Sequence, residues 1–382
     1  MHGGITFTAI KTMIIRKIFA ALFLVLPATS VFAASYQLQA LGGLSAGQNS
    51  LAYGLNDNGM VVGDAYNSVS GQSEAVYWDN GVIHSIGTTG RIRAVNNSGL
   101  MVGETGNLSL GTPNGRAFTY QNGVYTDIGT LNGTSVAGAY DVNEAGVITG
   151  YSFTDDAGFV FSGHGFRYEN GVMTDLGTIS NPQGYSRGHG INDLGQITGR
   201  ASYDRFANSE KTMVTWDAAN NLGIFSGPST YSTGQQINNN GIVVGNGYFG
   251  PDDEMRALIW ALDGSVTTLG TFGGLGSRAL SINDSNVLVG FAANSDEQKR
   301  AMVSYDGVNI VDLNTEVLDL QGFVSLDEAY DINESGQIVG VGTLATGERQ
   351  AFLLTAVPVP AAVWLFGSAL GLLGWMRKAR IS

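Results

Sequence analysis

One short pattern recurs seven times along the chain and restricts its possible folds more than any other feature. The pattern is an asparagine, two further residues and, in six of the copies, a glycine, flanked by apolar residues, as in AYGLNDNGMVVG from Ala52. Successive asparagines are 40 to 50 residues apart, a period typical of propellers and solenoids. The asparagines are Asn56, Asn96, Asn143, Asn192, Asn238, Asn283 and Asn333.

Each copy of this pattern predicts a tight turn between two strands. An asparagine can bond to the backbone two residues further on and so start a turn, and a glycine suits the left-handed conformation that closes it. In the sixth copy the glycine is replaced by Asn286. Asparagine is a side chain that tolerates positive φ well, so this exception supports the prediction.

A second pattern lies between these turns, as in EAVYWDNGVIHSIG and RAFTYQNGVYTDIGTLNG. Its Asn-Gly pairs predict two-residue hairpins at Asn80-Gly81, Asn122-Gly123 and Asn170-Gly171. Each repeat therefore contains two hairpins, or four short strands. The 55 glycines suit this architecture, and the absence of cysteine excludes disulfides and thiolate metal sites.

The two ends of the array predict how it closes. The seventh repeat stops after RQAFLLT and lacks a fourth strand, whereas YQLQALGGL from Tyr36 resembles the fourth-strand sequence TDIGTLNG. We expect Tyr36–Leu41 to pair with Gln350–Leu354, because closure removes exposed strand edges. The prediction is an all-β fold, a seven-bladed β-propeller over residues 34–355. An open β-solenoid or β-array is the alternative.

The repeats resemble a known family. NGVMTDLGT followed by GINDLGQITG, and HGFRY at His164, are similar to the HAF extracellular repeat, which implies a secreted bacterial protein without assigned chemistry. Most copies have arginine where that family has its histidine, as at Arg116. This departure argues against an essential role for the histidine.

The first 33 residues have the features of a secretory signal peptide. Arg16 and Lys17 precede an apolar stretch, Ile18–Leu26, that is too short to span a bilayer as a helix. Small residues place the expected cleavage between Ala33 and Ala34. The pattern begins at Met13, so both Met1 and Met13 stay open as the start, and a retained N-terminal anchor is the alternative to cleavage.

Residues 356–382 predict a C-terminal transmembrane helix followed by a basic cluster. Ala356–Met376 is uncharged and long enough, at about 1.5 Å per residue, to cross about 30 Å of hydrocarbon. The basic residues favour a cytoplasmic end, and a plain membrane anchor is the simplest interpretation. The residues of this expected signal are Val357, Pro358, Val359, Pro360, Arg377, Lys378 and Arg380.

The order of prolines, apolar run and basic cluster resembles the PEP-CTERM sorting signal of Gram-negative envelopes. That resemblance implies recognition by an exosortase-like enzyme, cleavage near the prolines and transfer to the cell surface or extracellular matrix. The glutamate of the family pattern is missing between Pro358 and Pro360, which leaves the cleavage point open.

Searches for reactive residues yield no catalytic or cofactor-binding motif. The histidines, His2, His84, His164 and His189, form no ligand-spaced cluster. DVNEAG from Asp141 and DINESG from Asp331 resemble half of a calcium loop but lack the acidic twelfth residue, so a capped turn is expected and calcium stays open. The recurring aromatics, which we assign to packing between blades, are Trp78, Tyr120, Tyr168, Trp216, Trp260 and Tyr305.

These observations predict a non-enzymatic interaction module of the envelope. A net charge of −13 excludes nucleic acid as an expected partner; polysaccharide or a surface protein is expected instead. A secreted propeller enzyme acting on glycans is the alternative, and it would need acids or a histidine converging in the channel. Asp127, Asp175 and Asp312 occupy repeated strand positions instead. The ligand and the oligomeric state stay open.

Overall fold

The computed structural model describes residues 35–106, 115–155, 163–179, 184–202, 211–224, 231–249 and 254–357. The chain divides into two units, Met1–Ala33 and Ala34–Ser382, and all described residues belong to the second. The predicted cleavage residues Ala33 and Ala34 and the tail from Pro358 lie outside these ranges. Within the ranges, no helix combines the length and apolar character required to cross a membrane.

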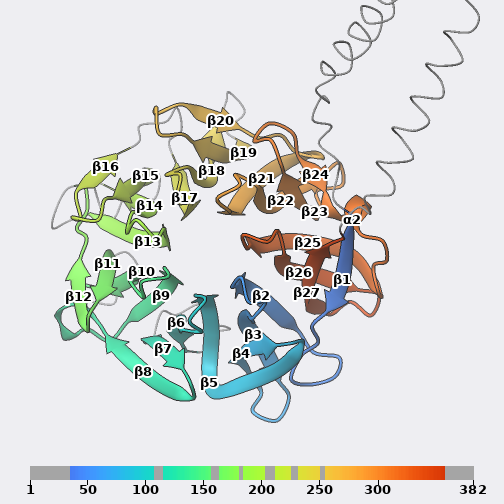
Figure 1. The fold of residues 1–382 in the computed structure, drawn as a ribbon, viewed down its shortest axis with the longest axis horizontal. Helices are drawn as coiled ribbons and strands as arrows, with labels where there is room; N and C mark the ends of the chain where they lie inside the picture. Colours follow the sequence, from blue (N-terminus) through green and yellow to red (C-terminus); the bar gives the residue numbers. More distant parts are fainter. Residues whose placement is uncertain are drawn as a thin grey trace, which may run out of the picture. The chain divides into compact units, whose positions relative to one another are not determined.

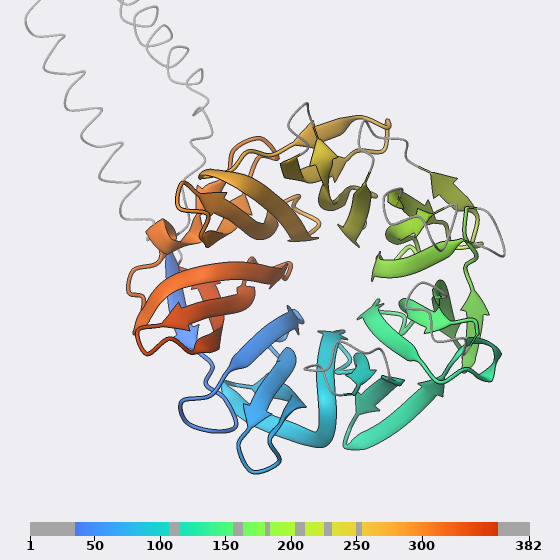
Figure 2. The same ribbon diagram turned by 180° about the vertical axis from the view of Figure 1, so that it is seen from behind.

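The described residues form seven antiparallel blades of four strands around a central axis (Figure 1). Strand β5 (Val82–Val95) serves two blades, because its first part pairs with β4 of blade 1 and the part from Gly90 pairs with β6 of blade 2. The view from behind shows the same ring of blades (Figure 2). The fold is therefore an all-β propeller, as the repeat predicts.

Blades 1 to 4 follow one another in chain order, each from its innermost strand outwards. Their remaining strands are β2 (Ser50–Leu55), β3 (Val61–Asn67), β4 (Gln72–Asp79), β6 (Met101–Thr105), β7 (Ala117–Gln121), β8 (Val124–Gly129), β9 (Ala137–Val142), β10 (Ile148–Phe153), β11 (Gly163–Glu169), β12 (Val172–Asp175), β13 (Tyr185–Ile191), β14 (Ile197–Ser202), β15 (Lys211–Trp216) and β16 (Leu222–Ile224). A 3-10 turn, η2 (Leu131–Gly133), precedes blade 3.

Blades 5 to 7 continue the ring, and a short helix, α2 (Leu313–Glu316), connects blade 6 to blade 7. Their strands are β17 (Ser232–Ile237), β18 (Val243–Phe249), β19 (Glu254–Trp260), β20 (Val266–Thr268), β21 (Gly273–Ile282), β22 (Leu288–Asn294), β23 (Lys299–Ser304), β24 (Val311–Asp312), β25 (Phe323–Ile332), β26 (Ile338–Leu344) and β27 (Arg349–Ala356).

The predicted closure is confirmed, with a small shift in its bounds. Strand β1 (Tyr36–Ala40) is the outermost strand of blade 7 and pairs with Phe352–Ala356 of β27, while the Leu41 N–H donates to the Ala351 carbonyl at 3.0 Å. Leu38 lies opposite Leu354 and is 2% exposed. The first and last described strands are thus hydrogen-bonded to each other, which excludes the open array.

Turn residues adopt the conformations that their sequence predicts. Asn80, Asn122 and Asn170 have φ of 50°, 51° and 52°, and each is followed by a glycine at positive φ, as a two-residue hairpin requires. Asn286, which replaces glycine in the sixth repeat, has φ of 63°. Local steric rules therefore account for the turns.

The hydrophobic core lies between neighbouring blades. Trp78, Trp216 and Trp260 are at most 2% exposed, and the Trp216 indole N–H donates to the Leu176 carbonyl of the preceding blade at 2.9 Å. The tyrosines at this position, such as Tyr120, are half-buried and pack on the equivalent clusters between other blades. The prediction that this aromatic set forms inter-blade packing is confirmed.

Candidate functional site: the central channel

The seven repeat asparagines form a closed ring of hydrogen bonds around the channel. Each Nδ2 donates to the main-chain carbonyl of the next ring asparagine at 2.9 to 3.2 Å. Each side chain is 3% to 6% exposed, and its oxygen also accepts main-chain N–H groups of its own turn, as Asn56 does from Asn58 and Met60. We call this set the asparagine ring.

The residue after each asparagine forms a second closed ring in the same direction. Each main-chain N–H donates to the side chain of the equivalent residue in the next blade at 2.7 to 3.0 Å. Burial raises the pKa of Glu144 and Glu334 in this acidic ring, and neighbouring acids add to the effect. The members are Asp57, Asn97, Glu144, Asp193, Asn239, Asp284 and Glu334.

A cavity of about 290 Å³ is lined by both rings. A second cavity, of about 480 Å³, lies on the other side of the residues two positions before each asparagine. We call these residues the waist; five of them line both cavities. The waist residues are Gly54, Ala94, Asp141, Gly190, Gln236, Ser281 and Asp331.

Two carboxyl groups of the waist connect the inner strands of different blades. Asp141 Oδ2 accepts the Ile191 N–H at 2.8 Å and the Gln236 side-chain amide at 3.1 Å. Asp331 accepts the Leu55 N–H at 3.1 Å and the Ser281 hydroxyl at 2.6 Å. Burial raises the pKa of Asp141 to about 7 and that of Asp331 to about 6.

These contacts bear on the calcium alternative. The carboxylate oxygens of Asp141 and Asp331 face N–H and O–H donors, which orient positive hydrogens at the positions that a cation would occupy. Among the residues that the structure describes, no group of three or more His, Cys, Asp or Glu side chains is placed to hold a metal ion.

The larger cavity has cations and tyrosines in its wall, and we call it the Arg–Tyr cavity. Arg93 lies over the rings of Tyr53 and Tyr140 at 5.3 and 5.1 Å from their centroids. Stacking of this kind holds a guanidinium plane in a defined orientation. The principal wall residues are Arg93, Arg200, Arg278, Lys299, Tyr53, Tyr140, Tyr330 and His189.

His189 contributes a neutral imidazole to this wall. Burial and the nearby Arg200 charge lower its pKa to about 3, against the opposing effect of its bond to Gly234. Its Nδ1 donates to the Gly234 carbonyl at 2.9 Å, which leaves Nε2 as an acceptor. The other histidines occupy different places: His84 stacks on Tyr77 of blade 1, and His2 lies outside the described residues.

The residue at the histidine position of the HAF-like motif pairs with an aspartate of the adjacent outer strand. His164 Nδ1 lies 2.9 Å from Asp175 Oδ2, and Arg116 Nε lies 2.9 Å from Asp127 Oδ2 in the preceding blade. Either arginine or histidine can therefore occupy this position, because each can pair with the aspartate of the outer strand.

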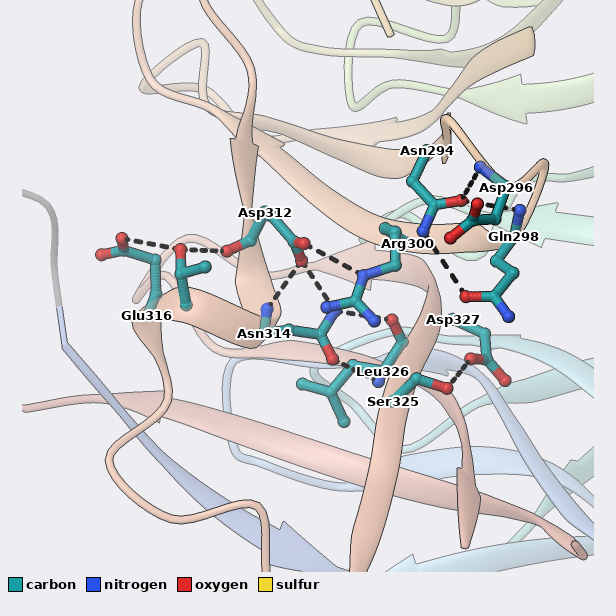
Figure 3. Close-up of polar contacts among 11 residues, drawn as sticks. Asn294, Asp296, Gln298, Arg300, Asp312, Asn314, Glu316, Ser325, Leu326 and Asp327 are labelled. Atoms are coloured by element: carbon teal, nitrogen blue, oxygen red, sulfur yellow. Dashed lines mark hydrogen bonds and ion pairs between the residues drawn. The ribbon is translucent and has the colours of Figure 1, made fainter. Parts of the chain in front are cut away.

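In blade 6 the same position belongs to a larger polar network. Arg300 Nε donates to Asp312 Oδ2 at 3.0 Å, and Asp312 also caps α2 by accepting the Asn314 N–H (Figure 3). The aspartates at repeated strand positions are thus salt-bridge partners in the outer blade.

Sequence reasoning missed the channel wall. The repeat pattern predicts the turns that the asparagines form, but the bonds between blades depend on the amide that points away from the turn. The half calcium loops at Asp141 and Asp331 do not by themselves indicate that both residues reach the waist. A usable signal was present: residues two and three positions before each asparagine vary strongly between repeats, while the turn itself does not.

Comparisons with known proteins yield structural similarity only. Neither a protein-family model nor a curated protein matches the sequence. Three solved structures are similar to this chain in fold alone, at 10% to 13% identity. They are a gluconolactonase from Xanthomonas campestris (TM-score 0.44, 11% identity, 87% of this chain and 94% of that one), TolB from Acinetobacter baumannii (0.42, 13%, 80% and 78%) and the β-propeller domain of the Trilobed protease from Pyrococcus furiosus (0.48, 10%, 84% and 95%).

Proposed function

We propose that this chain is an exported, non-enzymatic interaction module of the Gram-negative cell envelope, which binds its ligand in the Arg–Tyr cavity. The observation that carries the proposal is the cavity itself. It holds about 480 Å³ within a closed ring of blades and is lined by arginines that stack on tyrosines. Binding sites of this volume accommodate small ligands or the end of a polymer.

The rigidity of the ring of blades supports binding in the Arg–Tyr cavity. The asparagine ring connects all seven blades, and each bond contributes on the order of 1 kcal/mol. A wall that is fixed before the ligand arrives loses less entropy on binding. The proposed ligand class is a polysaccharide of the extracellular matrix or a surface protein.

The proposed cellular location depends on the sequences at the two ends of the chain. We propose that residues 1–33 are removed as a signal peptide, that residues 356–382 form a PEP-CTERM-like tail with a transmembrane helix, and that the repeats belong with the HAF type. Mass spectrometry of the mature protein tests this: a C-terminus near Pro360 would indicate sorting by an exosortase-like enzyme. An intact Ser382 would mean an ordinary anchor.

A second candidate, a secreted enzyme acting on glycans, is favoured by one observation. Asp141 and Asp331 both line the channel and have raised pKa values of about 7 and 6, as a carboxyl that donates a proton near neutral pH would. Yet each has both oxygens engaged by donors of the chain. This makes a structural role in joining blades the better account.

Binding measured together with product analysis separates these two functions. The purified chain is applied to a glycan array, and every bound glycan is then incubated with the chain and examined for shortened products. Binding without cleavage supports the module. Cleavage that is lost in Asp141→Asn and Asp331→Asn, but kept in Asp127→Asn of the outer blade, would establish the enzyme instead.

A further inference from the structure

The cations near the Arg–Tyr cavity outnumber the carboxylates that pair with them. Arg91 and Arg93 share one oxygen of Glu104, at 3.2 and 2.7 Å. Lys299 and Arg349 likewise share one oxygen of Glu328, at 3.2 and 3.0 Å. Counted by ion pairs alone, each group has one cation in excess. Asp64 also acts electrostatically on Arg91 and Arg93, and Asp327 on Arg349.

Among the described residues, the side chains that accept hydrogen bonds from Arg187 and Arg200 are neutral. Arg200 donates to the hydroxyls of Tyr231 and Tyr185 at 2.7 and 3.2 Å, and Arg187 donates to that of Tyr140 at 3.1 Å. Within the described ranges no carboxylate forms an ion pair with either arginine. Glu104 lies near enough to Arg187 to act on it electrostatically, whereas Arg200 has only the tyrosine hydroxyls as hydrogen-bond partners in this part of the chain.

Donor groups of these arginines also lack acceptors. The Nε atoms of Arg93, Arg187 and Arg200 are buried without a hydrogen-bond partner among the described residues. A guanidinium carries five N–H donors, and the bonds of Arg200 to tyrosine use two of them. Burying such a donor without an acceptor costs about 1–3 kcal/mol, and an acceptor that entered the cavity would offset this cost.

The tyrosines and the histidine of the wall do not neutralise the arginines. Burial raises the pKa of Tyr140 and Tyr151, which keeps both as neutral phenols. His189 is neutral as well, because its pKa is lowered. Four cations, Arg93, Arg200, Arg278 and Lys299, therefore face three carboxyls, those of Glu328, Asp141 and Asp331. Burial raises the pKa of Asp141 to about 7 and that of Asp331 to about 6, so near neutral pH the cations of the lining outnumber its ionised carboxylates.

The arrangement of the arginines suits an oxyanion. Arg187 stacks at 4.3 Å from the centroid of Tyr151, and Arg278 lies over Phe291 at 5.9 Å. Arginine planes held in this way can form two parallel bonds to a carboxylate or sulfate. Few apolar residues line the cavity, Leu280 and Phe291 among them, so a ligand that fills it is polar.

We propose that the Arg–Tyr cavity binds the acidic group of a saccharide, a uronic-acid carboxylate, with Arg200 as the principal recognising residue and Arg93 and Arg278 beside it. This inference rests on the proposed binding function and names the ligand class for that site. Arg187 is a positioning residue, because it reaches the cavity through Tyr140.

Calorimetry with three probes tests the inference on the full chain purified in detergent. The probes are trigalacturonic acid, the neutral galactotriose and inorganic sulfate. We expect the acidic trisaccharide to bind at least ten-fold more tightly than the neutral one, and its affinity to fall with added salt. Arg200→Gln should weaken this binding at least ten-fold, and Arg278→Gln should weaken it as well.

Arg116→Gln is the matched control, because it removes an arginine that is paired with Asp127 on an outer strand. This variant should bind the acidic trisaccharide with the same affinity as the wild type. Each variant is checked for an unchanged melting temperature, and Arg200→Lys, which retains the charge, should recover part of the binding. Equal affinity of Arg200→Gln, Arg278→Gln and wild type would overturn the inference.

Other results separate this inference from the function on which it rests. Equal binding of the neutral and acidic trisaccharides would overturn the oxyanion assignment but leave a glycan-binding module intact. Binding of sulfate as tight as that of the trisaccharide would overturn the saccharide assignment. Absence of binding to any probe or array glycan would overturn both the inference and the polysaccharide form of the proposed function.

Discussion

The side-chain amide of Asn333 donates a 3.1 Å hydrogen bond to the main-chain carbonyl of Asn56, although 277 residues separate the two. The other ring bonds join consecutive repeats that are 40 to 50 residues apart. The Asn333–Asn56 bond closes the circle between blades 7 and 1. It lies on the channel side, while β1 and β27 close the same pair of repeats on the outer side.

Replacing Asn333 by aspartate tests how much this bond contributes to the free energy of unfolding. Aspartate retains the oxygen that accepts the Gln337 N–H and the Ser335 hydroxyl, but it loses the donor and places a negative charge near the Asn56 carbonyl. We expect a loss of about 1–3 kcal/mol in the free energy of unfolding, measured by urea denaturation at pH 8. Asn294→Asp is the control, since Asn294 forms an equivalent turn with Asp296 and Gln298 but no bond to another blade (Figure 3). Equal losses in both variants would contradict a role for the ring.

Leu38→Ala tests the closing strand. Leu38 is 2% exposed and packs in the cluster that blades 6 and 7 share, so truncation should lower the free energy of unfolding by about 2–4 kcal/mol. Leu262→Ala, at a side chain that is 74% exposed, should change it by less than about 0.5 kcal/mol. A Leu38 variant as stable as the Leu262 variant would show that closure contributes little.

The raised pKa values of the two waist carboxyls predict that the protein loses stability as the pH rises. Burial raises the pKa of Asp141 to about 7 and that of Asp331 to about 6, above about 3.9 for an unfolded aspartate. Between these values the folded state binds more protons than the unfolded state, so the free energy of unfolding declines from about pH 4 to pH 7 and levels off above it. Urea midpoints measured from pH 5 to pH 8 check this.

The double variant Asp141→Asn, Asp331→Asn should have a flatter pH profile than the wild type. It is compared with Asp263→Asn, because Asp263 is an exposed turn residue. A wild-type profile that rises between pH 5 and pH 7, or a double variant with an unchanged slope, would contradict the assignment of raised pKa values to these two groups.

His164→Arg tests whether the histidine position is structural. Arginine occupies the equivalent place at Arg116 and Arg300 and pairs there with an aspartate, so the variant should stay within about 1 kcal/mol of the wild type. His164→Leu should cost about 1–3 kcal/mol, because it deprives Asp175 of this partner. Thermal unfolding of both variants decides the question; an arginine variant as unstable as the leucine variant would point to a requirement for imidazole.

Much of the fold could be predicted from the sequence, because it depends on local rules that repeat. Asn286 illustrates this: only a residue that tolerates positive φ can stand there, and its φ is 63°. The pairing of Tyr36 to Ala40 with β27 followed from one missing strand at one end and one extra strand at the other. Both the repeat period and the turn residues can be recognised from the order of residues along the chain, without knowledge of the tertiary structure.

The sequence by itself therefore determined the blades, their turns and the closing strand, since each depends on steric preference and periodicity over a few residues. Only the tertiary structure decided which side chains form the channel. Asp141 and Gln236 are 95 residues apart and meet at 3.1 Å, and Arg200 reaches Tyr231 from another blade. Their convergence depends on the radius and height at which each inner strand faces the axis, which no single repeat specifies until the ring has closed.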